Sequence, residues 1–99
     1  MLDRLTVDDF APWVGERFSL DAGGALVAAE LAWARAVGER PPAASARRWT
    51  FSLGFRTPPE VRLPQRIYGV VHPALGTLEL FLVPVQPDAE GNLYEAVFN

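Results

Sequence analysis

His72 is the single histidine of this sequence, and histidine is the residue whose unperturbed side chain titrates nearest neutral pH. It could act as a general base, or as a pH-sensitive group beside an acid such as Glu79 or Glu95. No neighbouring motif supplies the nucleophile or substrate contact that a general base requires. Because His72 precedes Pro73 at the end of a predicted strand, we instead expect its ring to bind a backbone carbonyl group and fix the turn.

The serines give no stronger sign of catalysis. A triad can be written from Ser52, His72 and Asp88, but any chain of this size permits one. None of the three serines, which are Ser19, Ser45 and Ser52, lies in a Gly-x-Ser-x-Gly motif. Ser52 is expected to point outward, opposite the apolar face of its strand. The sequence therefore predicts no catalytic residue, and we do not expect an enzyme.

Acidic residues raise the possibility of a metal site. Asp88, Glu90 and Asn92 stand at alternate positions, as oxygen ligands of calcium can, but the segment lacks the length and closing glutamate of an EF-hand. Asp, Asn and Gly together favour a plain turn. The absence of cysteine and the single histidine exclude thiolate and multi-histidine zinc sites within the chain. We predict no metal and no cofactor.

The remaining charged residues have simple structural interpretations. Asp8 and Asp9 fall in the first turn of a predicted helix, where carboxylates are favoured. Glu79 and Glu95 lie on predicted strands, where each is expected to pair with a cross-strand arginine such as Arg66.

One basic segment resembles a nucleic-acid contact. Arg47 and Arg48 precede Trp49, and an arginine with an aromatic ring can stack on a base. However, the net charge is −3, the opposite sign to that of a nucleic-acid binder. We therefore expect a solvated loop end here, and a regulatory domain acting on nucleic acid is disfavoured.

Aromatic residues are candidates for anchoring a protein partner. Trp13 and Trp49 are expected to pack in the core, whereas Trp33 is expected to be partly exposed. The segment Leu63–Gln65 together with Tyr68 could form a lip on the surface.

Length and composition restrict the protein class. The 99 residues suit one domain, residues 1–99, and 49% hydrophobic with 21% charged residues is ordinary for a folded chain. No apolar stretch approaches the roughly 20 residues that span a bilayer, so no membrane role is expected. No secretory signal is visible, and we expect a cytoplasmic protein that could be incorporated into a particle.

The first elements follow from local signals. Thr6 is a natural N-cap, with Asp9 in an imperfect capping box, and Pro12 and Gly15 limit the helix to about two turns. Its docking face should carry Phe10, Trp13 and Val14. A strand with Phe18 and Leu20 inward follows, and a glycine hairpin turn at residues 21–24 comes next.

The run Ala25 to Val37 is ambiguous. Its alanines suit a helix, but alternation that places Val27, Leu31 and Trp33 on one face suits a strand. The hairpin turn leads directly into it, so we predict a strand. The polar segment Gly38 to Arg48 should be a loop.

The second half reads as four strands. Residues 49–55 alternate cleanly, and Gly54 marks a bulge or a close backbone approach. Residues 66–72 and 77–85 follow, the latter apolar on both faces and therefore central, with Pro84 ending it or lying at an edge. A last strand over residues 93–98 is expected to be open to pairing with another chain. The fold predicted is mainly β, a small antiparallel barrel or roll of about six strands with one short N-terminal helix.

Several motifs resemble a known family. They include the opening Asp9-Phe-Ala-Pro, Phe51-Ser-Leu-Gly-Phe-Arg, His72-Pro-Ala-Leu-Gly, Leu80-Phe-Leu-Val-Pro-Val and the ending Tyr94-Glu-Ala-Val-Phe-Asn. Together they are similar to a family of small bacterial proteins of unknown function, of about 100 residues. The resemblance implies gene neighbours of the phage-tail-collar type, and hence a role in a tail-like or filamentous particle. It implies no catalytic residues.

These features predict a non-enzymatic structural, assembly or protein-binding domain that binds a protein partner or itself. The alternative is a small-molecule binder, or a modest hydrolase, that uses the mouth of the barrel as its pocket.

Overall fold

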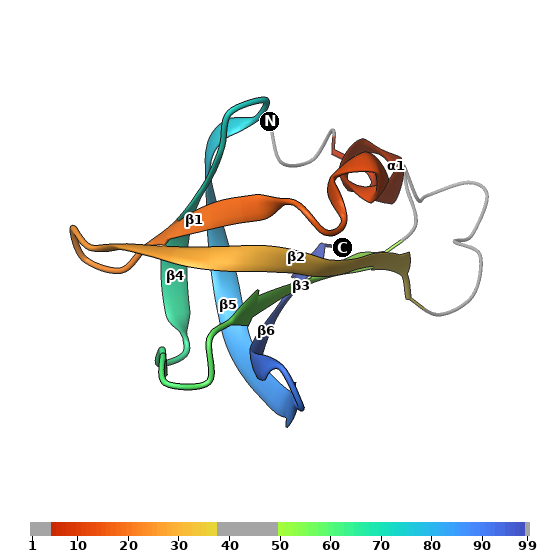
Figure 1. Ribbon diagram of the computed structural model, residues 1–99. Helices are drawn as coiled ribbons and strands as arrows, with labels where there is room; N and C mark the ends of the chain where they lie inside the picture. The colour runs from red at the N-terminus through yellow and green to blue at the C-terminus, as the bar shows by residue number, and fades with distance from the viewer. Residues whose placement is uncertain (1–4, 38–49, 99) are drawn as a thin grey trace.

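The computed structural model describes residues 5–37 and 50–98 and has the predicted mainly β architecture. Six strands close into an antiparallel barrel (Figure 1). The short helix α1, Val7–Phe10, continues into a 3₁₀ helix, Ala11–Trp13, at the N-terminal side. The strands are β1 (Arg17–Asp21), β2 (Leu26–Ala36), β3 (Phe51–Thr57), β4 (Arg66–His72), β5 (Gly76–Asp88) and β6 (Gly91–Phe98).

The order of the strands around the barrel is β1-β2-β3-β6-β5-β4. Each half of the chain is a three-stranded meander, and the pairs β1–β4 and β3–β6 join the two halves. A single meander, which is what turn spacing predicts, would instead pair β3 with β4. The observed order requires the segment between β3 and β4 to cross one end of the barrel.

The prediction of an open last strand is wrong over most of its length. β6 pairs with β3 from Asn92 to Phe98, and with β5 from Gly91 to Glu95. A strand with neighbours on both sides offers no free edge over its paired length, because its backbone groups already have partners. From Ala96 to Phe98 the strand pairs with β3 alone.

The helix begins as its sequence predicts. The backbone N–H of Thr6 donates to Asp9 Oδ2 at 2.8 Å, so the carboxylate satisfies a free donor at the helix start. Gly15, with φ of +92°, ends the turn in the left-handed region. Val14 departs from the prediction: it is 45% exposed and does not dock.

The ambiguous run is a strand, as predicted, but its faces change along its length. Leu31 lies opposite Phe55 and is buried, whereas Trp33 lies opposite Gly54. The register shift between Leu31 and Trp33 is a β-bulge that places an extra residue, Ala32, in β2. Trp33 therefore lies on the outer face of the barrel, contrary to the strict alternation expected from the sequence.

β5 also differs in part from its prediction. Leu78, Leu80 and Leu82 are buried, but Phe81 on the other face is 51% exposed. The strand therefore has a neighbour on each side, β4 and β6, but only one of its faces is buried. Pro84 lies beyond Leu82, the last residue paired with β4, so the edge position predicted for it is confirmed.

The barrel interior is filled by side chains from every strand. Its core members include Phe18, Leu20, Leu31, Phe51, Leu53, Phe55, Tyr68, Val70, Leu80, Leu82, Tyr94 and Phe98. At one end Phe10 from α1 packs on Phe51 and Phe98, with ring centroids 5.9 Å from each.

At the opposite end the segment between β3 and β4 is held across the barrel. Its Leu63 backbone N–H donates to the Tyr94 hydroxyl at 2.9 Å. The Asn92 side-chain amide donates to the carbonyls of Val61 at 2.6 Å and Pro59 at 3.1 Å. These bonds fix the crossing segment. Phe10 therefore covers one end of the barrel, and the segment between β3 and β4 covers the other.

Candidate functional site

His72 lies at the end of β4 with its side chain in the barrel, where it is only 5% exposed. The Trp13 and Phe18 rings lie 5.1 and 4.6 Å from the imidazole, centroid to centroid. The backbone N–H of Ala74 donates to Nδ1 at 3.1 Å, and Nε2 lies 2.9 Å from Glu16 Oε1. An accepting Nδ1 assigns the proton to Nε2, which then donates to the carboxylate.

The turn role predicted for His72 is right, but its bonding is reversed. The ring accepts from a backbone N–H instead of binding a carbonyl group. Its acidic partner is Glu16, not Glu79 or Glu95. With both ring nitrogens engaged and the ring buried, His72 has no atom left to remove a proton from a substrate. The Glu16 contact ties the start of β1 to the turn after β4.

Ser52 faces outward from the barrel, as expected, but it is fully buried because Trp33 covers it. The indole Nε1–H of Trp33 donates to Ser52 Oγ at 2.8 Å, and that hydroxyl donates to Glu95 Oε2 at 2.8 Å. Glu95 is therefore paired with Ser52 and not with Arg66, whose guanidinium lies 5.2 Å from the Tyr68 ring.

Gly54 makes this arrangement possible, and the predicted close approach is confirmed. A Cβ built on Gly54 would lie 2.4 Å from two ring atoms of Trp33. The indole thus packs flat on the β3 backbone. The Arg35 guanidinium lies over the Trp33 ring, 4.5 Å from its centroid. Trp33 is partly exposed, as predicted.

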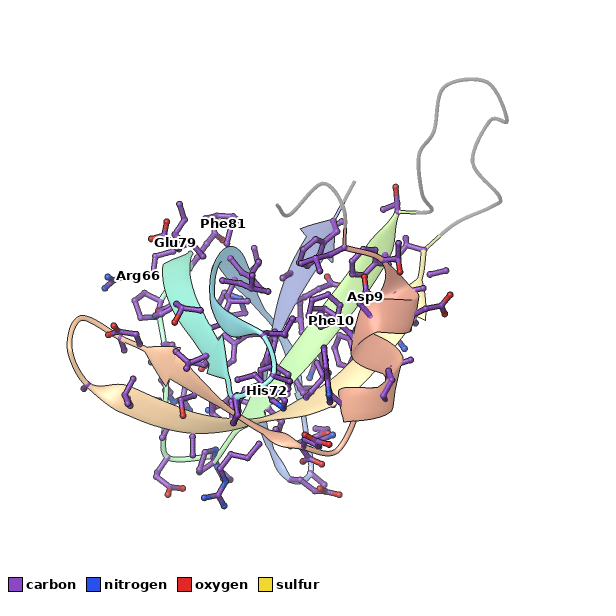
Figure 2. The ribbon with its side chains drawn as sticks, turned by 90° about the horizontal axis from the view of Figure 1, so that it is seen from above. Asp9, Phe10, Arg66, His72, Glu79 and Phe81 are labelled. Atoms are coloured by element: carbon purple, nitrogen blue, oxygen red, sulfur yellow. The ribbon has the colours of Figure 1, made fainter. Side chains whose placement is uncertain are left out.

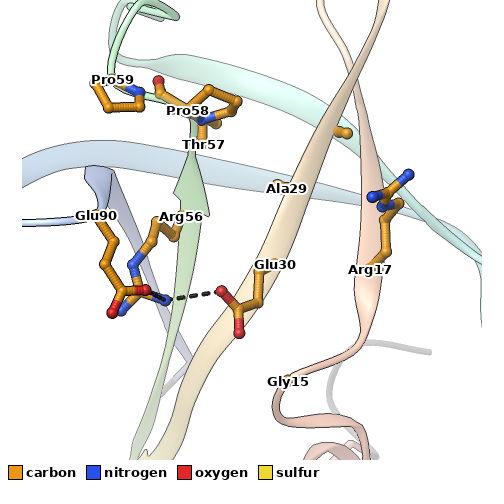
Figure 3. A pocket seen from close by; sticks show the side chains of 10 residues that line it. Gly15, Arg17, Ala29, Glu30, Arg56, Thr57, Pro58, Pro59 and Glu90 are labelled. Carbon is orange, nitrogen blue, oxygen red and sulfur yellow. Dashed lines mark hydrogen bonds and ion pairs between the residues drawn. The ribbon is translucent and has the colours of Figure 1, made fainter.

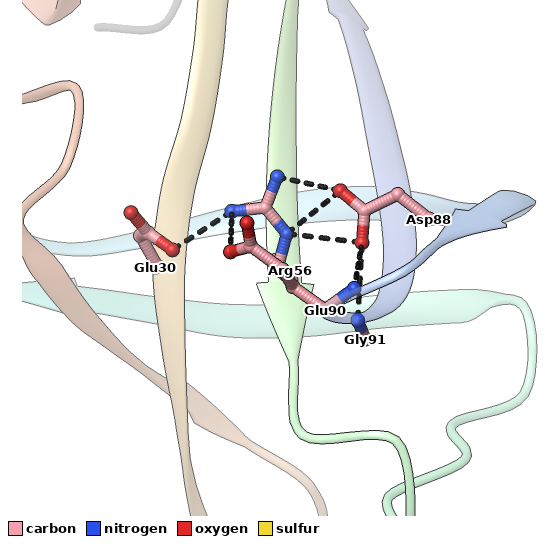
Figure 4. A network of polar contacts seen from close by, with 5 residues as sticks. All are labelled: Glu30, Arg56, Asp88, Glu90 and Gly91. Atoms are coloured by element: carbon pink, nitrogen blue, oxygen red, sulfur yellow. Dashed lines mark hydrogen bonds and ion pairs between the residues drawn. The ribbon is translucent and has the colours of Figure 1, made fainter.

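Arg56 is the centre of a polar network on the outer surface (Figure 4). Its guanidinium contacts Glu30 Oε1 at 2.8 Å, Asp88 Oδ2 at 2.7 Å and Glu90 Oε2 at 3.9 Å. Asp88 Oδ1 also accepts the backbone N–H groups of Glu90 and Gly91 at 2.9 and 3.0 Å. The hydrogen bond from Arg56 holds the pKa of Asp88 below its usual 3.8, and this bond raises the pKa of Arg56.

These contacts explain the acidic group that could have suggested calcium. Asp88 fixes the turn and binds a cation that the chain itself supplies, while Asn92 binds the crossing segment. The turn interpretation is confirmed. Ser52, His72 and Asp88 each have different partners, and no hydrogen bond joins any two of them.

A groove of about 500 Å³ lies beside the Arg56 network (Figure 3). Arg17 and Glu30 line it from neighbouring strands, and Pro58 and Pro59 form another wall. Arg17 lies opposite Glu30 in the β1–β2 pair, and Glu30 lies opposite Arg56 in the β2–β3 pair. Cations and anions alternate here and neutralise one another, so the groove carries no net preference for an anionic ligand.

A different part of the surface exposes apolar side chains. Ile67 and Phe81 are directly paired across β4 and β5, and they are 59% and 51% exposed. Figure 2 shows Phe81 and Glu79 on the same side of the molecule, directed away from the barrel interior. We define the β1–β4–β5 face as the outward residues of these three strands: Asp21, Ile67, Gly69, Glu79 and Phe81.

Other candidates from the sequence are easily placed. Trp13 packs partly against the core, as predicted, and Asp9 caps the helix. Tyr68 is buried, with its hydroxyl donating to the Pro64 carbonyl, so it forms no surface lip. Ser45, Arg47, Arg48 and Trp49, and the predicted loop at residues 38–48, lie outside the described residues.

Sequence reasoning missed Glu16 and Arg56. Glu16 stands 56 residues from His72, and Arg56 stands 26 residues from Glu30 and 32 from Asp88. One signal could have pointed to Arg56. It follows the alternating residues Phe51 to Phe55, so the alternation places its side chain on the outer face. No such local signal exists for Glu16.

Comparisons with known proteins agree with the resemblance only at the level of the family. Within the described residues, no helix is long and apolar enough to pass through a membrane. No curated protein and no solved structure matches the chain. A model of one family, the domain of unknown function DUF6916, matches residues 5–98, and the chain belongs to that family.

Proposed function

We propose that this domain is a non-enzymatic protein-binding module that acts in assembly, with the β1–β4–β5 face as its contact surface. The observation that carries the proposal is the exposed pair Ile67 and Phe81. Exposed aromatic and aliphatic side chains at adjacent positions supply the anchors that most protein interfaces use. They remain outside a barrel that already has a filled interior.

The position of the pair supports a binding role over a folding role. Both residues point away from the core and are mostly exposed, so they contribute little to the stability of the isolated chain. The family resemblance extends the proposal to a particle of the phage-tail or filamentous type, with a collar-like neighbour as the partner. A protein surface of this kind fits an accessory subunit.

The alternative of a small-molecule binder or hydrolase at the barrel mouth has less support. The Phe10 side chain covers one end, and the segment held by Tyr94 crosses the other. The groove beside Arg56 could take a ligand, but it lies on the outer surface and not at a mouth of the barrel.

The test uses the Phe81→Ser variant with Val14→Ser as a matched control, because Val14 is a comparably exposed apolar residue elsewhere. We measure self-association by light scattering, and binding to the purified collar-like neighbour by calorimetry. Loss of either interaction in Phe81→Ser alone supports the proposal, with an expected loss of affinity of about tenfold or more. A wild-type chain that stays monomeric and does not bind the neighbour contradicts it.

A further inference from the structure

The β1–β4–β5 face combines its apolar pair with two carboxylates. The next outward-facing row lies two residues along the strands from Ile67 and Phe81. In this row Asp21 lies opposite Gly69, and Gly69 lies opposite Glu79. Asp21 and Glu79 are both exposed. Since alternate residues of a strand share a face, both carboxylates lie on the same side of the sheet as Ile67 and Phe81.

Gly69 separates the two acids without a side chain of its own. A Cβ at this position would meet Asp21 Cβ at 3.4 Å and Thr77 Cγ2 at 3.5 Å, which are ordinary contact distances. The glycine is half-buried. The surface between Asp21 and Glu79 is therefore backbone, and an incoming side chain can lie over it with an acid on each side.

Neither acid forms an ion pair with an arginine of the described residues. Asp21 Oδ1 accepts the backbone N–H of Gly24 at 2.8 Å, and Glu79 has no ion pair among the described residues. The Arg56 network differs in this respect, because Glu30 and Asp88 each form an ion pair with its guanidinium. The face thus presents negative charge next to exposed apolar surface.

We infer that the β1–β4–β5 face binds a protein segment in which a basic side chain stands next to an apolar one. This inference rests on the proposed function and specifies the partner. The arginine or lysine would lie over Gly69 between Asp21 and Glu79, and the apolar side chain would cover Ile67 and Phe81. Complementary charge of this kind directs association and selects among partners.

The same charges disfavour the other occupants of an apolar face. A second copy docked face to face about a two-fold axis brings two pairs of acids toward one another. Nucleic acid and the anionic surface of a membrane are repelled for the same reason. The partner is therefore a basic region of a different protein.

The experiment selects binders from a random linear peptide library displayed on phage, with the full chain as the target. We expect enrichment of peptides with arginine or lysine beside leucine, phenylalanine or a similar residue. Synthetic peptides from the selection are then measured by fluorescence anisotropy at increasing salt. Binding should weaken as salt rises, because exposed charge pairs are screened.

Four variants locate the contact. Asp21→Asn keeps an oxygen for the Gly24 bond, and Glu79→Gln keeps the side-chain shape, so each removes charge alone. Each should weaken binding roughly two- to fivefold, as expected of exposed ion pairs. Gly69→Arg places a guanidinium between the two acids and should weaken binding about tenfold, as should Phe81→Ser. Glu60→Gln, an exposed acid elsewhere, should leave binding unchanged.

The outcomes separate the two proposals. The inference is overturned, and the binding function is left intact, in either of two cases. In the first, the peptides bind through Phe81 but carry no basic residue. In the second, their affinity is unchanged by both Asp21→Asn and Glu79→Gln. Self-association of the wild-type chain that depends on Phe81 also overturns it, since the occupant is then a second copy. A chain that binds no peptide, no neighbour and no second copy through Phe81 contradicts both. Circular dichroism of each variant checks that the barrel is folded.

Discussion

Gly54 shows how the absence of one side chain can determine the position of a much larger one. The Trp33 indole lies on the backbone of β3 because no Cβ stands in its way. From there it covers Ser52 and completes the hydrogen-bonded chain from Trp33 through Ser52 to Glu95. A residue that would be solvated on a bare sheet is thereby buried with its polar group satisfied.

We predict that Gly54→Ala destabilises the fold by about 1–3 kcal/mol, as overpacking at a filled site does. The added Cβ would overlap the rigid ring of Trp33, which must then leave its position over Ser52. Urea unfolding followed by tryptophan fluorescence measures the change. Gly69→Ala is the matched control, because its Cβ meets neighbours at ordinary distances of 3.4 and 3.5 Å. Equal effects of the two substitutions would contradict this account.

His72 illustrates a second lesson at the level of single residues. Its sequence context correctly indicates a turn-fixing role, since the residue before a proline at a strand end has nearby backbone groups. The identity of the acid beside it depends on Glu16, which is 56 residues away in the chain. Type and local position suggest what a side chain can do, but the fold supplies its partner.

Single elements are joined on the outer surface through Arg56. It extends from β3 to Glu30 of β2 on one side and to Asp88, at the end of β5, on the other. The turn between β5 and β6 is therefore attached to the first half of the chain by an ion pair as well as by the β3–β6 ladder. The pair is exposed to solvent, so salt weakens it.

We predict that the Asp88 interaction stabilises the protein at neutral pH and ceases to do so in acid. The pKa of Asp88 is lowered in the folded protein relative to 3.8. Its contribution is therefore complete above that value, and is lost as pH falls through the lower folded pKa. Asp88→Asn retains an oxygen for the turn, so the variant removes the charge specifically.

Unfolding of wild type and Asp88→Asn across pH measures this effect. We expect the wild type to be more stable at neutral pH, with the difference shrinking well below pH 3.8. Added salt should reduce the difference at neutral pH. Glu90→Gln is the control, because that carboxylate lies 3.9 Å from the guanidinium and is mostly exposed. A difference that does not depend on pH would show that the charge is not responsible.

At the scale of the whole molecule, closure of the barrel determines which surfaces are left to act. With β1 paired to β4 and β3 paired to β6, the paired backbone is internally satisfied. Under the proposed binding function, we therefore expect a partner to recognise side chains on an outer face. This is why the exposed apolar pair of Ile67 and Phe81 carries more weight for function than the position of the last strand.

Closure also depends on what covers the barrel end. We predict that Phe10→Ala costs about 3–5 kcal/mol, because it removes a buried ring that packs on Phe51 and Phe98. For a domain of this size each kcal/mol lowers the melting temperature by roughly 4–8 °C. Thermal unfolding by circular dichroism measures the loss. Val14→Ala, next to the same helix but exposed, should change stability by less than about 0.5 kcal/mol. A small effect of Phe10→Ala would mean that α1 does not close the barrel.

Local chemistry determined the elements of this protein. Alternating apolar residues fixed the strands, glycines and prolines fixed the turns, and Thr6 with Asp9 fixed the start of the helix. Each of these signals acts between residues close in the chain, so it can be read without knowing the fold.

Only the tertiary structure decided the order of the strands, the change of face at the bulge in β2, the burial of Ser52 and the partners of His72 and Arg56. Each depends on segments that are remote in sequence, such as Ser52 and Glu95, which are 43 residues apart. Alternation along one strand specifies which side chains share a face, but it carries no information about which other strand will lie beside it. The outer face with two carboxylates around Gly69 therefore became visible only when β1, β4 and β5 were placed side by side.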